Sequence, residues 1–105
     1  MFSFFEFETI FMQVKLEQNG SKGAFFIEES GDRLAAMEFS MAGTDKMIID
    51  HTEVDDRLRG KGAGRILLNH LVDFVRENNI KVIPLCPFAR SVFQKDSSIR
   101  DVLFG

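Results

Sequence analysis

The chain has 105 residues, a formal net charge of −3 and one cysteine, so it has room for one domain and cannot form an internal disulfide. Hydrophobic residues make up 45% and charged residues 28%, which is typical of a folded globular chain rather than a disordered one. The acidic balance disfavours a nucleic-acid partner, and no apolar run approaches the roughly 18 residues that a membrane helix needs.

The first eleven residues, MFSFFEFETIF, contain five of the 12 phenylalanines and no basic residue. A secretory signal needs a basic start and a small-residue cleavage site, and the segment has neither. Residues 1–11 are therefore expected to be either an extra edge strand or an extension outside the folded domain, with Met12 as the native start. The folded domain is expected over residues 12–105, and the default location is the cytoplasm.

Four strands are expected next, joined by short turns. The β-like runs are residues 13–18, 23–29, 33–41 and 46–54. Asn19-Gly20, Ser30-Gly31-Asp32 and residues 42–45 are turn sequences between them. Consecutive strands with short turns predict an antiparallel meander.

Beyond residue 54 the pattern changes to helices around one further strand. A glycine-rich basic loop over residues 57–64 precedes a helical pattern that ends near Asn78-Asn79. The expected core face of this helix is Ala63, Ile66, Leu67, Leu71, Phe74 and Val75. Residues 80–85 are a short apolar run that favours a strand. Pro87 suits the first turn of a second helix, and the side chains expected to point inward from it are Phe88, Val92 and Phe93.

The tail, residues 97–105, is too short to assign. The order ββββ–loop–α–β–α predicts an α+β, or mixed α/β, fold in one domain. Because the fourth and fifth strands flank a helix, they are expected to be parallel neighbours joined by a right-handed crossover.

The strongest local signal is the string RLRGKGAGR at residues 57–65, which leaves a strand and opens a helix. Three glycines let the backbone turn sharply and expose its amides, and the helix start adds partial positive charge. Four cationic side chains belong to the string: Arg57, Arg59, Lys61 and Arg65. The combination is typical of a phosphate or pyrophosphate site, the alternative being a flexible turn with solvated charges. A Walker A loop and a dinucleotide fingerprint both need residues that the string lacks.

The spacing Arg57-x-x-Gly60-x-Gly62 resembles the acetyl-CoA pyrophosphate loop of the GNAT acetyltransferase superfamily, which reads Gln/Arg-x-x-Gly-x-Gly/Ala. In that family the loop also lies between a fourth strand and a long helix. The strings HTEV at residues 51–54 and PLCPFA at residues 84–89 are similar to small stand-alone GNAT-like proteins. The resemblance runs from Met12 to about Leu103. It implies a minimal GNAT fold in which strands four and five are parallel and splayed around CoA.

The resemblance also implies a ligand, acetyl-CoA, lying in this splay. Backbone groups near Glu53 and Val54 would pair with its pantetheine arm. The backbone amides expected to hold its pyrophosphate are those of Arg59, Gly60, Lys61, Gly62, Ala63 and Gly64. The side chains of Arg59, Lys61 and Arg65 are the candidates for the remaining phosphates.

The implied reaction is transfer of acetyl from acetyl-CoA to a primary amine of a small molecule, a protein lysine or a protein N terminus. The family's usual Tyr acid is Phe93 here, which has no proton to give, and its usual Asn is Cys86. In the small subfamily this cysteine is the suggested catalytic residue, either protonating the CoA thiolate or attacking the thioester. At a helix N-cap the helix dipole favours the thiolate. The alternative for Cys86 is a small buried side chain at a tight junction.

His51 and Glu53 alternate along one strand and therefore share a face. If that face meets the cleft, either could deprotonate an amine; the alternative is a solvated pair on the sheet. His70 lies off the apolar face of its helix and is expected to be structural or exposed. The two histidines and Cys86 share no metal-ligand spacing, so no metal is expected.

Larger GNAT enzymes carry helices between their first two strands that help to form the acceptor pocket, whereas here residues 19–22 are a bare turn. The acceptor site is therefore expected to be shallow, open or completed by a partner. The missing Tyr and the missing helices leave open a non-catalytic CoA or acyl-CoA-binding module, or an interaction domain. Acetyl-CoA and an unknown amine are the expected partners of a monomer or weak dimer, without nucleic acid or membrane.

Overall fold

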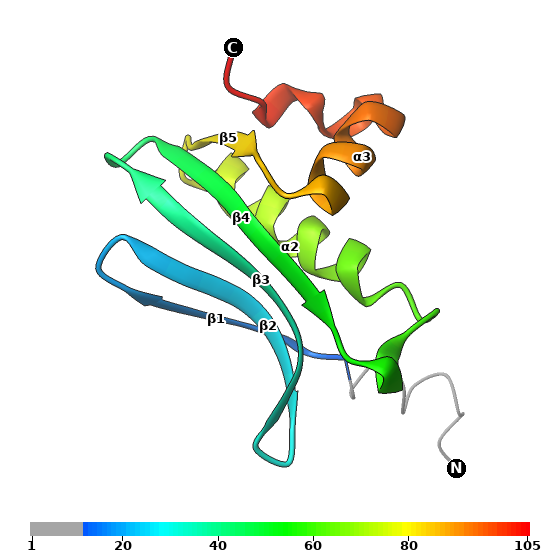
Figure 1. Cartoon of the computed structure of the whole chain (residues 1–105). Helices are drawn as coiled ribbons and strands as arrows, with labels where there is room; N and C mark the ends of the chain where they lie inside the picture. The colour runs from blue at the N-terminus through cyan, green and yellow to red at the C-terminus, as the bar shows by residue number, and fades with distance from the viewer. Residues whose placement is uncertain (1–11) are drawn as a thin grey trace.

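The predicted meander is confirmed, and a fifth strand adds to it in parallel (Figure 1). The computed structural model describes residues 12–105, so the expectations for residues 1–11 lie outside the described residues. The strands are β1 Val14–Asn19, β2 Lys22–Glu29, β3 Asp32–Ala42, β4 Lys46–Val54 and β5 Lys81–Pro84. They stand in chain order across one sheet, with β1 to β4 antiparallel. The expected bare turn is also present, since only two residues separate β1 from β2.

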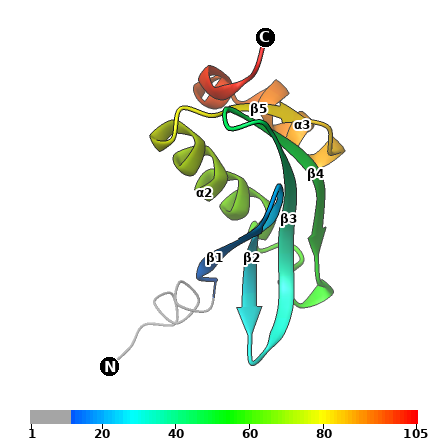
Figure 2. The ribbon, with the colours of Figure 1, turned by 90° about the vertical axis from the view of Figure 1, so that its left-hand side faces the viewer.

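Two helices follow the meander. Helix α2 (Ala63–Glu77) crosses one face of the sheet, and α3 (Pro87–Lys95) follows β5. Figure 2 shows α2 on one side of the sheet, while the opposite side of β2 and β3 is left open. The described residues also form two 3₁₀ turns, η1 (Asp56–Leu58) before α2 and η2 (Ser97–Val102) after α3. No helix within residues 12–105 is long and apolar enough to span a membrane.

The tail that the sequence left unassigned packs against β5. After η2, Leu103 forms a parallel bridge with Val82, and the Phe104 amide donates to the Val82 carbonyl at 3.0 Å. Ile99 and Val102 of η2 are buried in the main core. The C-terminal segment therefore closes one end of the molecule beside α3.

The predicted core face of α2 is right in part. Ala63, Leu67, Leu71 and Val75 are buried as expected, but Ile66 and Phe74 are partly exposed. Three residues of α2 outside the predicted face are also buried: Gly64, Leu68 and Val72. The reason is that α3 and η2 pack on a second side of α2, which widens its buried stripe beyond the side that faces the sheet.

The inward face predicted for α3 also needs correction. Phe88 is 38% exposed, whereas Ala89 and Phe93 are buried and Val92 is partly exposed. Because α3 begins at Pro87, Phe88 lies in the first turn, and the pair Ala89 and Phe93, four residues apart, shares the face that packs on the core.

Strands β4 and β5 pair over only part of β4. The parallel register joins Lys46–Ile49 to Lys81–Pro84, whereas β4 runs on to Val54. A shift in the β3–β4 register follows Ile49, since Phe39 pairs with Ile49 and Glu38 with His51, leaving Asp50 as a bulge. The amides of Leu85 and Cys86 both donate to the Ile49 carbonyl, each at 3.1 Å, before the chain turns into α3. Strand β4 and the segment that follows β5 therefore diverge after Ile49, as the expected splay requires.

Candidate active site

The glycine-rich loop between β4 and α2 is anchored at its start. The side chain of Leu58 is buried in the main core. Asp55 accepts hydrogen bonds from the Arg57 amide at 2.9 Å and from Arg57 Nε at 3.0 Å. Arg57 therefore lowers the pKa of Asp55 to about 2. A longer contact of 3.8 Å joins the same guanidinium to Asp32 at the start of β3. Arg57 thus holds the loop against the sheet.

The loop ends at the start of α2, where the residues Ala63 and Gly64 are buried. Gly60 and Gly62 have φ angles of 77° and 75°, a left-handed conformation that favours glycine. Gly62 is the N-cap of α2, and the first helical hydrogen bond runs from the Ile66 amide to its carbonyl at 3.0 Å. No side chain caps the amides of the first turn, which belong to Ala63, Gly64 and Arg65. Such amides, with the positive end of a 15-residue helix, are a candidate anion site.

Two of the amides expected to bind pyrophosphate have internal partners instead. The Arg59 amide donates to the Asp56 carbonyl, and the Lys61 amide donates to the Leu58 carbonyl, each at 3.1 Å. These bonds shape the turn that leads into Gly62. Of the predicted amides, those of Arg59 and Lys61 are therefore engaged within the loop, and the candidates for an anion include the amides at the helix start.

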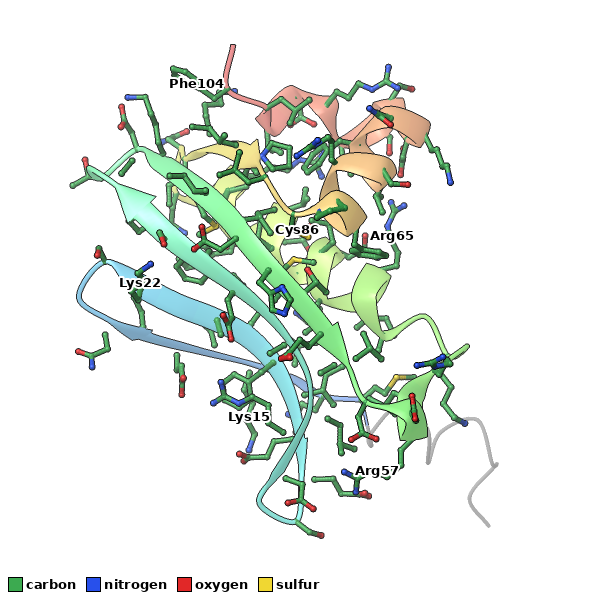
Figure 3. The ribbon with its side chains drawn as sticks, viewed as in Figure 1. Lys15, Lys22, Arg57, Arg65, Cys86 and Phe104 are labelled. Carbon is green, nitrogen blue, oxygen red and sulfur yellow. The ribbon has the colours of Figure 1, made fainter. Side chains whose placement is uncertain are left out.

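The candidate phosphate-binding side chains are differently engaged. Arg59 is highly exposed and forms an ion pair with Asp56 at 2.6 Å. Arg65 turns away from the loop (Figure 3): its Nε donates to Asn69 at 2.9 Å, and its other guanidinium nitrogen pairs with Asp96. Hydrogen bonds from Ser98 and then from Arg65 lower the pKa of Asp96 to about 2. The Arg65 side chain therefore ties α2 to the end of α3.

Exposed apolar residues occur near the diverging ends of β4 and β5. Val54, Leu85 and Phe88 are 36%, 54% and 38% exposed. The Asp55 amide donates to the Leu34 carbonyl at 2.7 Å, so the neighbouring pair, Val54 with Ala35, is not hydrogen-bonded. The backbone N–H and C=O of Val54 therefore point away from β3, toward the splay. An extended ligand could pair with them.

Cys86 lies where the splay begins (Figure 3). Its thiol is free and buried, and it is the N-cap of α3, accepting from the Ala89 amide at 3.4 Å. Its sulfur is also 3.2 Å from Oγ1 of Thr52 on β4. The sequence thus placed Cys86 correctly at the helix start. Phe93, which replaces the expected acid, is 3% exposed and packs in the core.

His51 and Glu53 share a face, as expected, but it is not the face of Cys86. Thr52 points toward Cys86, so alternation along β4 directs His51 and Glu53 to the opposite side of the sheet. Nε2 of His51 is 3.6 Å from Oε1 of Glu53, and both side chains are exposed. The structure therefore does not gather the three candidate catalytic residues into one cluster. His70 is exposed on α2.

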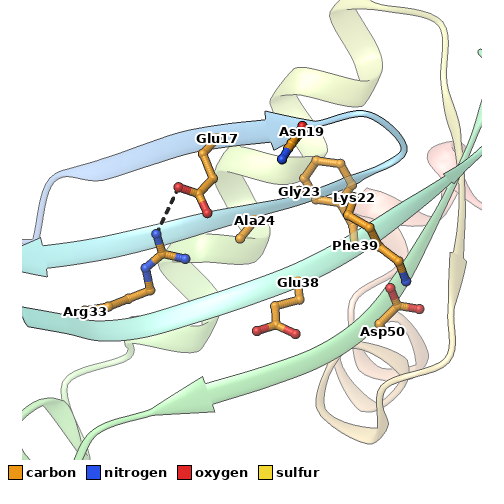
Figure 4. Close-up of a pocket in the computed structure, with 9 residues that line it drawn as sticks. All are labelled: Glu17, Asn19, Lys22, Gly23, Ala24, Arg33, Glu38, Phe39 and Asp50. Carbon is orange, nitrogen blue, oxygen red and sulfur yellow. Dashed lines mark hydrogen bonds and ion pairs between the residues drawn. The ribbon is translucent and has the colours of Figure 1, made fainter.

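The open face of the sheet carries two shallow hollows near His51 and Glu53. One, of about 320 Å³, is shown in Figure 4 with its Glu17–Arg33 ion pair of 3.0 Å. Its lining residues are Glu17, Asn19, Lys22, Gly23, Ala24, Arg33, Glu38, Phe39 and Asp50. The second, of about 340 Å³, includes Glu38, Glu53 and Val54. Since Val54 and Asp55 are among its lining residues, this second hollow reaches the end of β4.

Three residues that the sequence did not assign to the candidate site lie next to Cys86 in space or in the chain: Thr52, Leu85 and Phe88. The signal for Thr52 is the alternation of HTEV, because Thr52 and Val54 must face away from His51 and Glu53. Leu85 and Phe88 carry no such signal, since an apolar residue beside a strand end is usually core. Among residues 12–105 no group of three or more His, Cys, Asp or Glu side chains is placed to hold a metal ion.

Comparison with known proteins identifies the fold. Residues 24–102 match the family model of the GCN5-related N-acetyl-transferases. A GCN5-like protein from Staphylococcus aureus, a proposed N-acetyltransferase, is 35% identical, with 90% of each chain covered and a TM-score of 0.70. The ribosomal-protein-alanine N-acetyltransferase of Brucella melitensis biovar Abortus 2308 is 22% identical (TM-score 0.61), with 74% of this chain and 62% of that chain covered.

The ribosomal-protein-S18-alanine N-acetyltransferase of Escherichia coli also has a TM-score of 0.61 at 19% identity. The match covers 74% of this chain and 53% of the Escherichia coli chain. At this identity the two ribosomal-protein enzymes show a shared fold alone. No curated protein matches the chain.

Proposed function

Because the chain belongs to the GCN5-related N-acetyltransferase family, we propose that it transfers an acetyl group from acetyl-CoA to a primary amine in the cytoplasm. One observation carries the proposal. The uncapped first turn of α2 lies at the end of the loop that follows β4, where β4 has already parted from β5. Uncapped helix amides and the exposed apolar side chains of Val54, Leu85 and Phe88 therefore flank the region between β4 and β5, which suits a diphosphate joined to a long arm.

The residues present fit acetyl-CoA. The first-turn amides of α2 would bind its diphosphate, with Arg59 and Lys61 meeting phosphate charge at the exposed end of the loop. The backbone of Val54 would pair with the amides of the arm, and Leu85 and Phe88 would cover its apolar length. Arg65 would contribute its backbone amide, because its side chain is held by Asp96.

Cys86 is the residue we assign to the thioester end. The tetrahedral adduct forms when the neutral amine attacks the acetyl carbon, and it collapses by breaking the bond between that carbon and the CoA sulfur. In one assignment the Cys86 thiol gives its proton to the departing thiolate and is reprotonated from solvent. In the other, the Cys86 sulfur attacks the thioester, forming S-acetyl-Cys86 and releasing CoA, and the amine then attacks this second thioester.

The amine would arrive from the open face of the sheet. His51 and Glu53 stand there and could accept the ammonium proton directly or through water. The hollow that joins Glu53 to Val54 supports an approach between that face and the splay. A shallow open surface also fits the absence of helices between β1 and β2, and it accommodates an amine on a large molecule as readily as a small one.

A second candidate is a CoA-binding module that does not turn over. The observation in its favour is Phe93, which is buried in the core and replaces the tyrosine that usually protonates the leaving thiolate. In that case the loop and the splay would still bind the ligand, but an added amine would not be acetylated. The two functions share the ligand and differ only in product.

Calorimetric titration with acetyl-CoA tests the ligand first, with NADH and ATP as controls. We expect selective, saturable binding in the micromolar range, about −8 kcal/mol. Release of free CoA thiol, with acetyl-amine detected by mass spectrometry over a panel of amines and lysine peptides, then tests the reaction. Binding without product from any amine would favour the binding module, and absence of binding would overturn both.

A further inference from the structure

One close contact joins the starts of the two helices. Gly64 lies in the first turn of α2, and Phe88 lies in the first turn of α3. A Cβ atom built on Gly64 would stand 2.8 Å from Cζ of Phe88, with two further ring carbons at 3.1 and 3.3 Å. Real Cβ atoms essentially never come within 3.0 Å of another atom, so a side chain at position 64 would require the far end of the Phe88 ring to shift.

This contact accounts for a glycine that the backbone does not require. Gly60 and Gly62 have positive φ angles, but Gly64 is helical and is not among the residues with positive φ. Within a helix glycine is less favourable than alanine. The Phe88 ring therefore supplies the reason for glycine at this position, while Gly60 and Gly62 are explained by the turn.

The contact also lies between the two ends of the proposed acetyl-CoA site. Gly64 carries one of the uncapped amides at the start of α2, and Phe88 stands two residues after Cys86. The ring is 38% exposed, so it is only partly fixed by the core, and its seat on Gly64 limits where it can lie. Where the ring does not rotate away, its outward displacement moves the first turn of α3 relative to that of α2.

We propose that Phe88 is a positioning residue whose ring, seated on Gly64, sets the spacing between the diphosphate-binding amides of α2 and the Cys86 thiol. The inference rests on the proposed function. Acetyl-CoA spans both points as one molecule, so its diphosphate and its thioester can be held together only at a matching spacing. A fragment that uses the amides alone, such as ADP, has no such requirement.

A double-mutant cycle tests the coupling. Gly64→Ala adds the clashing Cβ, Phe88→Leu shortens the side chain that it meets, and the third variant carries both. We expect Gly64→Ala to weaken acetyl-CoA binding about tenfold in the native background but far less in the Phe88→Leu background. The two substitutions would then be coupled by about threefold or more in affinity. ADP affinity, measured by competition with acetyl-CoA, is expected to change less than twofold in Gly64→Ala. The control is Phe104→Leu, which alters a ring that is 53% exposed at the C terminus and is expected to leave both affinities unchanged.

Melting temperatures of the four proteins without ligand separate positioning from unfolding. We expect Gly64→Ala to melt within a few degrees of the native chain, because the helix gains from alanine what the displaced ring loses. Independent effects of the two substitutions on acetyl-CoA affinity, or an equal loss of ADP and acetyl-CoA affinity, would overturn the positioning role while leaving the proposed function intact. A native chain that binds no acetyl-CoA would overturn both.

Discussion

The hydroxyl oxygen of Thr52 lies 3.2 Å from the sulfur of Cys86 and joins β4 to the start of α3 across the point where β4 and β5 part. The sulfur also accepts a hydrogen bond from the Ala89 amide, so two groups fix the orientation of the Cys86 side chain. A cysteine that only filled space would not need the hydroxyl. The pair therefore offers a way to test the thiol without removing it.

Thr52→Val keeps the shape of the side chain and removes its hydroxyl. We expect turnover to fall about tenfold, which corresponds to about 1.4 kcal/mol, because the thiol loses one of the two groups that orient it. Acetyl-CoA affinity should stay within a few-fold, and Thr52→Ser should retain most of the activity. Steady-state kinetics measures the turnover and calorimetry measures the acetyl-CoA affinity. Equal rates for Thr52→Val and the native chain would show that the contact has no part in the reaction.

Cys86→Ala is expected to abolish turnover while acetyl-CoA binding stays within a few-fold, since the bound diphosphate and arm lie mainly on other groups. Intact-protein mass spectrometry of the native chain, taken with acetyl-CoA and no amine, distinguishes the two roles of the thiol. An adduct of one acetyl group that disappears when amine is added indicates S-acetyl-Cys86. Absence of this adduct indicates that the thiol protonates the departing CoA thiolate. Undiminished turnover in Cys86→Ala would remove the residue from the mechanism.

Gly62→Glu should eliminate acetyl-CoA binding, because it places a carboxylate beside the amides that would hold the diphosphate. Gly20→Glu, in the β1–β2 turn, is the matched control. Both glycines have positive φ, 75° and 65°, and neither has an atom within 4 Å of a built Cβ, so the backbone strain is alike. Calorimetry should find binding lost in the first and kept in the second; loss in both, or in neither, contradicts the assignment of the loop.

Stability should fall in acid partly through Asp55. Its pKa is lowered from 3.8 to about 2 by the Arg57 hydrogen bonds, so its contribution is present above pH 3.8 and is lost as the pH falls through 2. Asp55→Asn should therefore lower the melting temperature at pH 7 and reduce its dependence on pH between 4 and 2. An unchanged acid dependence in this variant would mean that the Asp55–Arg57 pair does not hold the loop.

The sequence was sufficient for the strand order, the glycine loop and the position of Cys86 at a helix start, because each depends on local patterns. Turn dipeptides mark the hairpins, and Pro87 marks the first turn of α3. It was not sufficient for the surroundings of these residues. The sequence predicts Arg65 as a phosphate ligand, but in the structure its side chain pairs with Asp96 between α3 and η2. The sequence likewise assigns Gly64 to a phosphate loop, whereas the structure shows the Phe88 ring packed against it. Both contacts join residues more than twenty positions apart.

The side of α2 that faces the core shows the same limit and gives a direct test. Helical spacing predicted Leu71 and Ile66 on one buried face, but α3 and η2 cover a neighbouring side, so Leu71 is fully buried and Ile66 is partly exposed. Leu71→Ala should cost about 2–5 kcal/mol, the range for a leucine removed from a closed core. Ile66→Ala should cost clearly less, because solvent already reaches part of its side chain. Urea unfolding of the two variants compares them, and equal losses would show that both side chains are enclosed to the same degree.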